Sequence, residues 1–401
     1  MKYVSGPYTQ AQLLREIRQI KMTLSERVLR SGVITDAAEQ RSWRERVQDA
    51  SFGRNTVMYD VDGNPSVMVV VPLFTEADVL AGGRNMPHPA FIVNGVTKPT
   101  LYIGKYQCIT AGVDGAASSR ALSLPNRDPK NTIHFDNARL ACKQNGTGWH
   151  LMTNAEWAAL ALQCKNKGFM PRGNNNYGKD ADEATVKGTP AHYYDVAGTK
   201  YIGRTLTGSG PVAWSHDGTP YGVYDLNGNV YEWVGGMRLN NGEIQILADN
   251  SAADNTKDQA VGSAEWKAVL QDGSLVAPGT AGTLKYDSTG ADSGVGTDVG
   301  DILLSTAIIN SLPTSYAHNT FQTTAAAEGV TVPNLLKLLG LMPVDADHGG
   351  DGHYMRNAGE RLPLRGGCWS NTAVAGVFFL NLSLLRSYAG GTLGFRAAFV
   401  G

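Results

Sequence analysis

Glycine is the residue that most limits what this chain can fold into. The chain has 47 glycines and 17 prolines with no three-residue period, so a collagen-like triple helix is excluded. From about residue 85 onward, Gly, Pro and Asn interrupt the sequence every few residues, and these residues mark turns. We therefore expect short segments joined by irregular loops, with few helices.

Two helices are predicted in this region. Residues 136–145 are rich in Ala and Leu, and a second helix is predicted to start at Thr153, which forms a capping-box pattern with Glu156. Residues 239–345 are interpreted as an insertion. Its middle, residues 278–300, is rich in Gly, Ser, Thr and Asp and predicts a surface loop, whereas the apolar residues 334–341 predict a helix or a buried segment.

Residues 1–84 are expected to form a separate segment that serves assembly. Its first helix is predicted from the helical spacing of four apolar residues, Leu13, Ile17, Ile20 and Leu24, and is expected to end at Gly32. A second helix is predicted from Asp36, as N-cap, to about Asp49. The two helices can form a hairpin packed on the main domain or a short oligomerising coiled coil, and both alternatives stay open.

A β-hairpin is predicted over residues 56–74. Its turn, residues 60–64, starts like a calcium loop, but Pro65 stands where such loops need Gly and Val71 where the closing Glu belongs. We therefore interpret it as a turn.

Charge and cysteine usage exclude several classes of protein. With 35 Lys and Arg against 36 Asp and Glu, the net charge of −1 provides no global basic field for nucleic acid. The four cysteines form no CxxC pair, which argues against a zinc ribbon or a redox dithiol. No secretory signal or membrane-spanning apolar run is present, so we expect synthesis in the cytoplasm, with exit by a route such as cell lysis if the protein works outside.

No catalytic set stands out. Signatures such as GxSxG, HExxH and the phosphate loop are absent. Residues 348–353 contain two His and an Asp, but their three glycines favour a flexible loop over a metal site. The acids Glu156, Asp225 and Glu232 lie among aromatic residues, and a structural hydrogen-bonding role is favoured over proton transfer.

Four sequence elements are similar to one known family. These are residues 88–106, residues 143–157 ending in Glu156-Trp157, residues 221–234 with the sequence YGVYDLNGNVYEWV, and a C-terminal set formed by LRGGCW and LGFRAA. In this order they resemble the formylglycine-generating enzyme, or sulfatase-modifying factor, family. The resemblance implies an α+β fold, the C-type-lectin variant of that family, over residues 85–401 with the insertion at about 239–345.

The resemblance does not extend to the oxidase chemistry of the family. Its two copper-binding cysteines fall on Phe378 and Ser383 of this chain, and Cys368 takes the place of a serine that is not catalytic. We therefore expect no enzyme activity, no catalytic residue and no bound metal or cofactor. Calcium near Asn229 and Glu232, which some family members allow, is an open alternative.

Residues 365–398 resemble the variable region of diversity-generating retroelement proteins, which include phage tropism determinants. In that class, adenine-directed mutagenesis changes surface residues on a C-type-lectin fold. Mutated AAY codons cannot encode Lys, Glu, Gln or Met, and none of these occurs between Gly367 and Gly394. The only Trp there is Trp369, which belongs to the fixed motif.

The resemblance divides the segment into a frame and a ligand-binding set. The frame is expected to comprise Trp233, Arg365, Trp369, Arg386, Phe395 and Arg396. The variable ligand-binding residues are expected to be Cys368, Ser370, Thr372, Val374, Phe379, Ser383, Leu384, Leu385, Tyr388, Gly390 and Thr392. A frame that holds its shape while other side chains vary suits a binding surface.

The resemblance also implies a place of action. We expect a receptor-binding protein at a phage tail-fibre tip in the virion, with a bacterial cell surface as the alternative location. Its partners would be a host-cell surface protein or glycan and other virion or tail components, with no nucleic acid and no membrane insertion, and the expected oligomer is a homotrimer. An invariant lectin-like structural or surface protein is the alternative function.

Overall fold

The computed structural model describes residues 15, 19 and 33–401. The residues that predict the first helix, Leu13, Ile17, Ile20 and Leu24, and its stop at Gly32 therefore lie outside the described residues. None of the helices in the described part of the chain is long and apolar enough to cross a membrane.

The predicted hairpin and the C-terminus meet in one five-stranded sheet. Its strands, in spatial order, are β1 (Asn55–Tyr59), β2 (Pro65–Pro72), β5 (Thr100–Gly104), β25 (Ala397–Phe399) and β8 (Trp149–Leu151). All four pairings are antiparallel. The turn between β1 and β2 is closed by the Asp60 carboxylate, which accepts the backbone N–H groups of Asp62 and Asn64. Because β2 pairs with β5, the expected border at residue 84 passes through this sheet.

Four helices of five or more residues lie in the described part of the chain beyond residue 33: α2 (Ala37–Ala50), α3 (Phe135–Lys143), α4 (Asn154–Asn166) and α5 (Asn334–Leu338). The predicted N-cap of α2 is confirmed, because the Asp36 side chain accepts the Glu39 N–H at 2.7 Å. The capping box of α4 is also present. Thr153 Oγ1 accepts the N–H of Glu156, and Glu156 Oε2 accepts the N–H of Thr153.

A six-stranded sheet contains most of the C-terminal motif. Its spatial order is β18 (Ala317–Thr320), β20 (Gly352–Met355), β23 (Leu380–Leu382), β22 (Leu364–Arg365), β11 (Tyr231–Trp233) and β24 (Leu393–Phe395). The strands of the LRGGCW, GNVYEW and LGFRAA elements are thus neighbours, although about 160 residues separate β11 from β24 in sequence. Residues 348–353, expected to be a flexible loop, lead into β20, and both of their histidines are buried.

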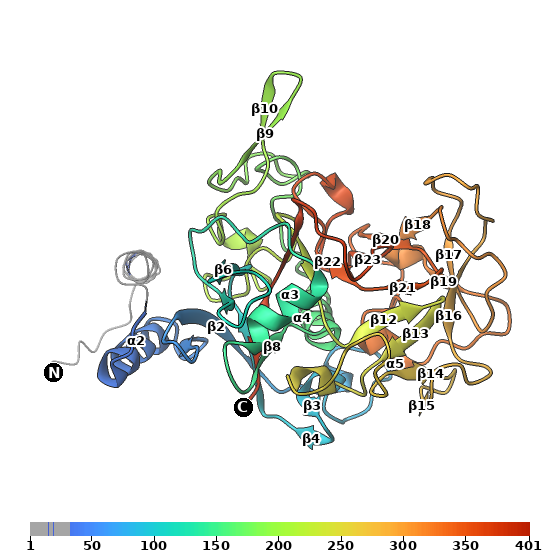
Figure 1. Ribbon diagram of the computed structural model, residues 1–401, viewed down its shortest axis with the longest axis horizontal. Coiled ribbons are helices and arrows are strands. Elements are labelled where there is room, and N and C mark those ends of the chain that lie inside the picture. Colours follow the sequence, from blue (N-terminus) through green and yellow to red (C-terminus); the bar gives the residue numbers. More distant parts are fainter. Residues whose placement is uncertain (1–14, 16–18, 20–32) are drawn as a thin grey trace.

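The region 237–361 builds an eight-stranded sheet on one side of the molecule (Figure 1). Its path is β15 (Leu275–Val276), β14 (Lys267–Val269), β13 (Glu243–Ile246), β16 (Lys285–Ser288), β17 (Ile302–Ser305) and β19 (Ala325–Ala326), with β12 (Met237–Asn240) and β21 (Glu360–Arg361) joined through β13. The expectation of a surface loop over 278–300 is wrong at β16, where Tyr286 is fully buried. Its hydroxyl donates to the Leu341 carbonyl.

Three two-stranded hairpins complete the fold: β3 (Ile92–Val93) with β4 (Val96–Thr97), β6 (Ile109–Ala111) with β7 (Arg120–Leu122), and β9 (Tyr193–Val196) with β10 (Thr199–Ile202). The β9–β10 hairpin projects away from the body of the molecule (Figure 1). It carries four large apolar or aromatic side chains that are 41–58% exposed: Tyr193, Tyr194, Val196 and Tyr201.

Candidate ligand-binding face

Arg396 anchors the end of the C-terminal motif inside the core. Its guanidinium makes two hydrogen bonds with the Glu232 carboxylate, at 3.0 and 2.7 Å, and donates to the carbonyls of Gly104 and Tyr224. Both members of this ion pair are essentially fully buried. A buried pair is held in place by the cost of leaving either charge without its partner, so Arg396 fixes β24 and β25 against β11 and β5.

Arg365 anchors the start of the motif, and it has no carboxylate partner among residues 33–401. It donates to Asn154 Oδ1 at 2.6 Å and to the Gly340 carbonyl at 2.8 Å. Burial lowers the pKa of Arg365 to about 9. Two further expected frame residues, Trp233 and Phe395, are fully buried, and Trp233 Nε1 donates to the Ile133 carbonyl.

Arg386 ties the loop 383–392 to three separate parts of the fold. Its guanidinium bonds to both oxygens of Glu360, to the Asp136 carboxylate at the start of α3 and to the Gln259 carbonyl. It also lies over the Phe135 ring, 5.1 Å from the ring centroid. This single side chain therefore connects the loop to α3 and to β21.

The loop 383–392 is held mainly through its backbone. Its carbonyls accept N–H groups from four residues outside it, at 2.8 to 3.3 Å: Leu362, Phe135, Thr132 and Tyr231. Leu385 and Tyr388 are 49% and 48% exposed, and Ser387 and Ala389 are exposed as well. The loop thus keeps its path through backbone carbonyls, which every residue has, while these four side chains face solvent.

The expected ligand-binding residues before the loop form a short turn. Thr372–Val374 is a single 3₁₀ turn, and Thr372 has a φ of 57°. Asn371 Oδ1 accepts the Cys368 N–H, and the Thr372 N–H bonds to the Asn175 carbonyl. Thr372 is exposed, and Ser370 and Val374 are half-buried.

Two residues expected on the surface are in the core, which corrects the sequence prediction. Phe379 is fully buried and packs against the rings of Tyr231 and Tyr354. Cys368 is 2% exposed, and burial raises the pKa of its thiol. The physical reason for Phe379 is the buried Asp351 carboxylate, which accepts the N–H of the preceding Phe378 at 2.7 Å and draws this part of the chain inward.

The other expected ligand-binding residues are intermediate. Ser383, Leu384, Gly390 and Thr392 are half-buried, and Leu384 packs against the core formed by β8, β11 and β24. We use "C-terminal face" for the exposed and half-buried members of the expected set: Ser370, Thr372, Val374, Ser383, Leu384, Leu385, Tyr388, Gly390 and Thr392.

A pocket of about 530 Å³ lies where the C-terminal face meets the β9–β10 hairpin. We call it the aromatic pocket, and its lining residues are Asn131, His192, Tyr194, Arg204, Trp369, Ser370, Gly391 and Thr392. Residues at 369–370 and 391–392, at opposite ends of the expected variable region, thus share one cavity with a hairpin about 175 residues earlier. The ring of Tyr194 is 5.3 Å from that of Trp369.

The contribution of β9–β10 is not among the predictions from the sequence. A signal was present, because two stretches rich in aromatic and β-branched residues, 193–196 and 199–202, flank a two-residue linker that ends in Gly198, a pattern typical of a hairpin. The Asp195 side chain accepts the Gly198 N–H and closes the turn.

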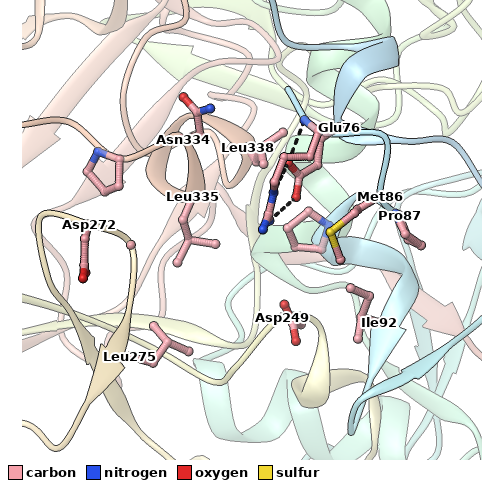
Figure 2. A pocket seen from close by; sticks show the side chains of 14 residues that line it. Glu76, Met86, Pro87, Ile92, Asp249, Asp272, Leu275, Asn334, Leu335 and Leu338 are labelled. Atoms are coloured by element: carbon pink, nitrogen blue, oxygen red, sulfur yellow. Dashed lines mark hydrogen bonds and ion pairs between the residues drawn. The ribbon is translucent and has the colours of Figure 1, made fainter. Parts of the chain in front are cut away.

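A second pocket, of about 470 Å³, lies between residues 76–92 and the eight-stranded-sheet region (Figure 2). Glu76 in its wall is paired with Arg84, with Nε 2.9 Å from Oε2. Asp249 and Asp272 also line it, together with apolar residues such as Leu275 and Leu335. None of the expected ligand-binding residues lines this pocket, so it is separate from the C-terminal face.

The residues near Asn229 and Glu232 do not fit a calcium ion. Both Glu232 oxygens accept hydrogen bonds from Arg396, and Oε1 also accepts from Gln107. Asn229 Oδ1 accepts from Asn174 and from the Thr205 N–H. These oxygens already have donors, and a guanidinium stands where a cation would be. No group of three or more His, Cys, Asp or Glu in the described part of the chain could hold a metal ion.

Comparison with known proteins finds one domain family that part of the chain matches. Residues 84–269 match the family model "Sulfatase-modifying factor enzyme 1-like domain". The predicted resemblance to this family and the predicted α+β, C-type-lectin-like fold are confirmed. No match is found among curated proteins.

Several solved structures are similar to the chain. PvdO from Pseudomonas aeruginosa is 15% identical, with 86% of this chain and 98% of that chain covered and a TM-score of 0.34. Treponema denticola variable protein 1 is 13% identical, with 86% and 99% covered and a TM-score of 0.32. The Major Tropism Determinant P3c variant is 11% identical, with 84% and 65% covered and a TM-score of 0.28. At such scores the similarities support no functional assignment by themselves.

Proposed function

We propose that this chain, which contains a sulfatase-modifying factor enzyme 1-like domain, is a ligand-binding protein that recognises its target through the C-terminal face. We further propose that a diversity-generating retroelement varies this face. The chain would then perform no bond chemistry.

One observation carries the proposal: the groups that hold the loop 383–392 in place are different from the side chains that the loop exposes to solvent. Backbone carbonyls and Arg386 fix its path, whereas Leu385, Ser387, Tyr388 and Ala389 are exposed. Exchange of these four side chains leaves the hydrogen bonds that define the loop in place. Exposed aromatic and aliphatic groups on a rigid support are the residue types that anchor interfaces.

The residue types of the segment support variation. Between Gly367 and Gly394 no Lys, Glu, Gln or Met occurs, as expected where adenines of AAY codons have been replaced. Frame residues remain constant in such a system, and here Arg365, Trp369, Arg386 and Arg396 all make contacts that hold the structure.

The residues that would replace the family's copper cysteines argue against an oxidase. Phe378 is buried between Phe321 and His348, and Ser383 Oγ donates to Asn381 Oδ1. Neither side chain supplies a thiolate ligand, and the four cysteines of the chain are all buried and free. We therefore propose that the chain binds without catalysis.

A phage tail-fibre tip is the proposed location, with a bacterial cell surface as the alternative. The partners would be a host-cell surface component and other tail proteins, and residues 1–84 would join the chain into a homotrimer. Trimerisation would multiply a modest affinity at each site. An invariant lectin-like structural protein is the competing function, and it predicts no tolerance of variation on this face.

The test is a matched pair of display libraries of the full chain. One randomises six positions of the C-terminal face: Ser370, Thr372, Val374, Leu385, Tyr388 and Thr392. The other randomises six exposed apolar positions elsewhere: Val96, Val113, Val212, Val261, Val295 and Ile309. Selection on bacterial cells should yield folded binders from the first library alone. Equal recovery from both libraries, or loss of folding throughout the first, would contradict the proposal.

A further inference from the structure

We propose that the aromatic pocket binds a neutral saccharide unit. This inference rests on the proposed function, because Ser370 and Thr392 belong both to the pocket and to the C-terminal face. It names the class of ligand that this part of the face would take.

The first support is an aromatic wall shared by the hairpin and the fixed motif. Tyr194 and Tyr201 are paired in register across β9 and β10, so their side chains share one face of the hairpin. Tyr194 lies against Trp369, and Tyr177 contacts both Tyr201 and Trp369, with ring centroids 5.2 to 5.4 Å apart. Trp369 is 93% buried, since only 7% of it is exposed, so its position is fixed. Such rings provide apolar contact for the C–H faces of a sugar.

The second support is a pair of polar atoms, on two residues that line the pocket, that lack partners. Trp369 Nε1 and His192 Nδ1 are buried and have no hydrogen-bond partner among residues 33–401. An unsatisfied buried donor or acceptor costs about 1–3 kcal/mol, and such groups in a pocket wall suit a ligand that supplies the missing bond. Trp369 Nε1 can only donate, whereas the imidazole nitrogen can donate or accept according to its tautomer. A ligand that carries hydroxyl groups, which both donate and accept, offers a suitable partner to either atom.

The third support is the charge balance of the pocket. Its one arginine, Arg204, is bonded to both oxygens of Asp128, at 2.7 and 2.9 Å. The guanidinium is therefore already paired and does not favour a carboxylate or phosphate ligand. Besides His192 and Trp369, the remaining polar side chains are the amide of Asn131 and the hydroxyls of Tyr194, Ser370 and Thr392. Hydroxyl-rich, uncharged ligands match this set better than charged peptides do.

The size of the pocket agrees with this class of ligand. Its volume of about 530 Å³ lies within the range of small-molecule sites, and its lining combines polar groups with the rings of Tyr194 and Trp369. Variation at Ser370 and Thr392 would change the hydroxyl pattern without moving Trp369, so one scaffold could be tuned to different sugars.

Two adjacent tyrosines offer a matched pair of variants. Tyr194 lines the pocket and is 44% exposed, while Tyr193 is 58% exposed and does not line the pocket. Neighbouring side chains on a strand point to opposite faces. Tyr194→Ala and Tyr193→Ala therefore remove the same group from the same hairpin on opposite sides.

The test is binding of the full chain to an array of immobilised neutral and sialylated oligosaccharides, followed by titration of the best neutral oligosaccharide. Tyr194→Ala should weaken binding about tenfold, as should Trp369→Phe, which keeps an aromatic ring and removes the N–H donor. Tyr193→Ala should bind within about twofold of the parent chain. Melting temperatures of all three variants check that they fold.

Absence of binding to any neutral oligosaccharide at millimolar concentration would overturn the inference, as would an equal loss in Tyr193→Ala and Tyr194→Ala. Preferential binding of sialylated oligosaccharides would also overturn it, because the charge argument would then fail. In each of these cases, folded cell binders from the C-terminal-face library would leave the proposed function standing. Failure of that library as well would reject both.

Discussion

Arg386 and Glu360 form a two-point ion pair that joins the displayed loop to the eight-stranded-sheet region. Nε lies 3.0 Å from Oε2, and Nη2 lies 2.9 Å from Oε1. Arg238 bonds to the same carboxylate from β12. The loop that carries Leu385 and Tyr388 therefore takes its position partly from β12 and β21, the two strands that border the predicted insertion.

Substitution of Arg386 should destabilise the protein more than substitution of any exposed residue of the loop. We expect Arg386→Ala to lower the free energy of unfolding by about 2 kcal/mol, because Glu360 loses one partner while it keeps Arg238. Ser387→Ala, at the next and exposed position, should change it by less than about 0.5 kcal/mol. Urea denaturation measures both, and equal effects would show that the ion pair does not hold the loop.

The C-terminal face should tolerate change where the core does not. The double variant Leu385→Ala/Tyr388→Ala should stay within about 1 kcal/mol of the parent, because both side chains are about half exposed. Phe379→Ala should cost about 3–5 kcal/mol, as for other buried aromatic residues. If thermal melts showed comparable losses of stability in the two variants, the distinction between the displayed loop and its support would be contradicted.

Calcium should have no effect on stability. The Glu232 and Asn229 oxygens already accept hydrogen bonds, two of them from Arg396. The melting temperature in millimolar calcium chloride should equal that in EDTA. A rise in calcium that is absent in magnesium would reveal a site that these contacts do not allow.

The buried carboxyl of Asp351 should make stability depend on pH. Burial raises the pKa of Asp351 from 3.8 to about 7. Between these values the folded state holds a proton that the unfolded state has lost, so the contribution of this group is greatest in acid and declines as pH rises. We expect the stability difference between the parent chain and Asp351→Asn to shift against the parent by roughly 1.4 kcal/mol per pH unit between about pH 4 and pH 7.

The comparison with Asp351→Asn isolates this carboxyl from its neighbours. Burial lowers the pKa values of His348 and His353 to about 4 and about 3. Protonation of these histidines therefore destabilises the folded state as pH falls, which is the opposite of the pH dependence expected from Asp351. Both chains contain these histidines, and their effects cancel in the difference. Parallel profiles for the two chains from pH 4 to pH 8 would show that Asp351 does not titrate in this way.

Local signals in the sequence predicted the elements that local contacts build. The capping box of Thr153 and Glu156, the N-cap Asp36 and the first hairpin are all present. The apolar residues 334–341 contain α5, as expected for a helical or buried segment. In each case the determining contacts lie within a few residues.

The wrong predictions concern residues whose positions depend on contacts with distant parts of the chain. Phe379 and Cys368 lie in a stretch without strand alternation, so nothing local showed that Asp351 and the rings of Tyr231 and Tyr354 would enclose Phe379. Residues 285–288 have the composition of a loop but pair on both sides within a sheet. The aromatic pocket joins residues about 175 positions apart, and no local pattern in a single sequence predicts that such distant residues lie close together.

The most direct test of the central proposal is to sequence the DNA beyond the 3′ end of the coding region. A diversified C-terminal face requires a near-copy of the segment that encodes residues 365–398. The copy should differ almost only where it contains adenine, at codons of the C-terminal face such as those for Ser370, Leu385, Tyr388 and Thr392. It should be unchanged at the codons of Arg365, Trp369, Arg386 and Arg396. Absence of a copy, or differences spread equally over frame codons, would contradict a diversified face and leave an invariant lectin-like domain.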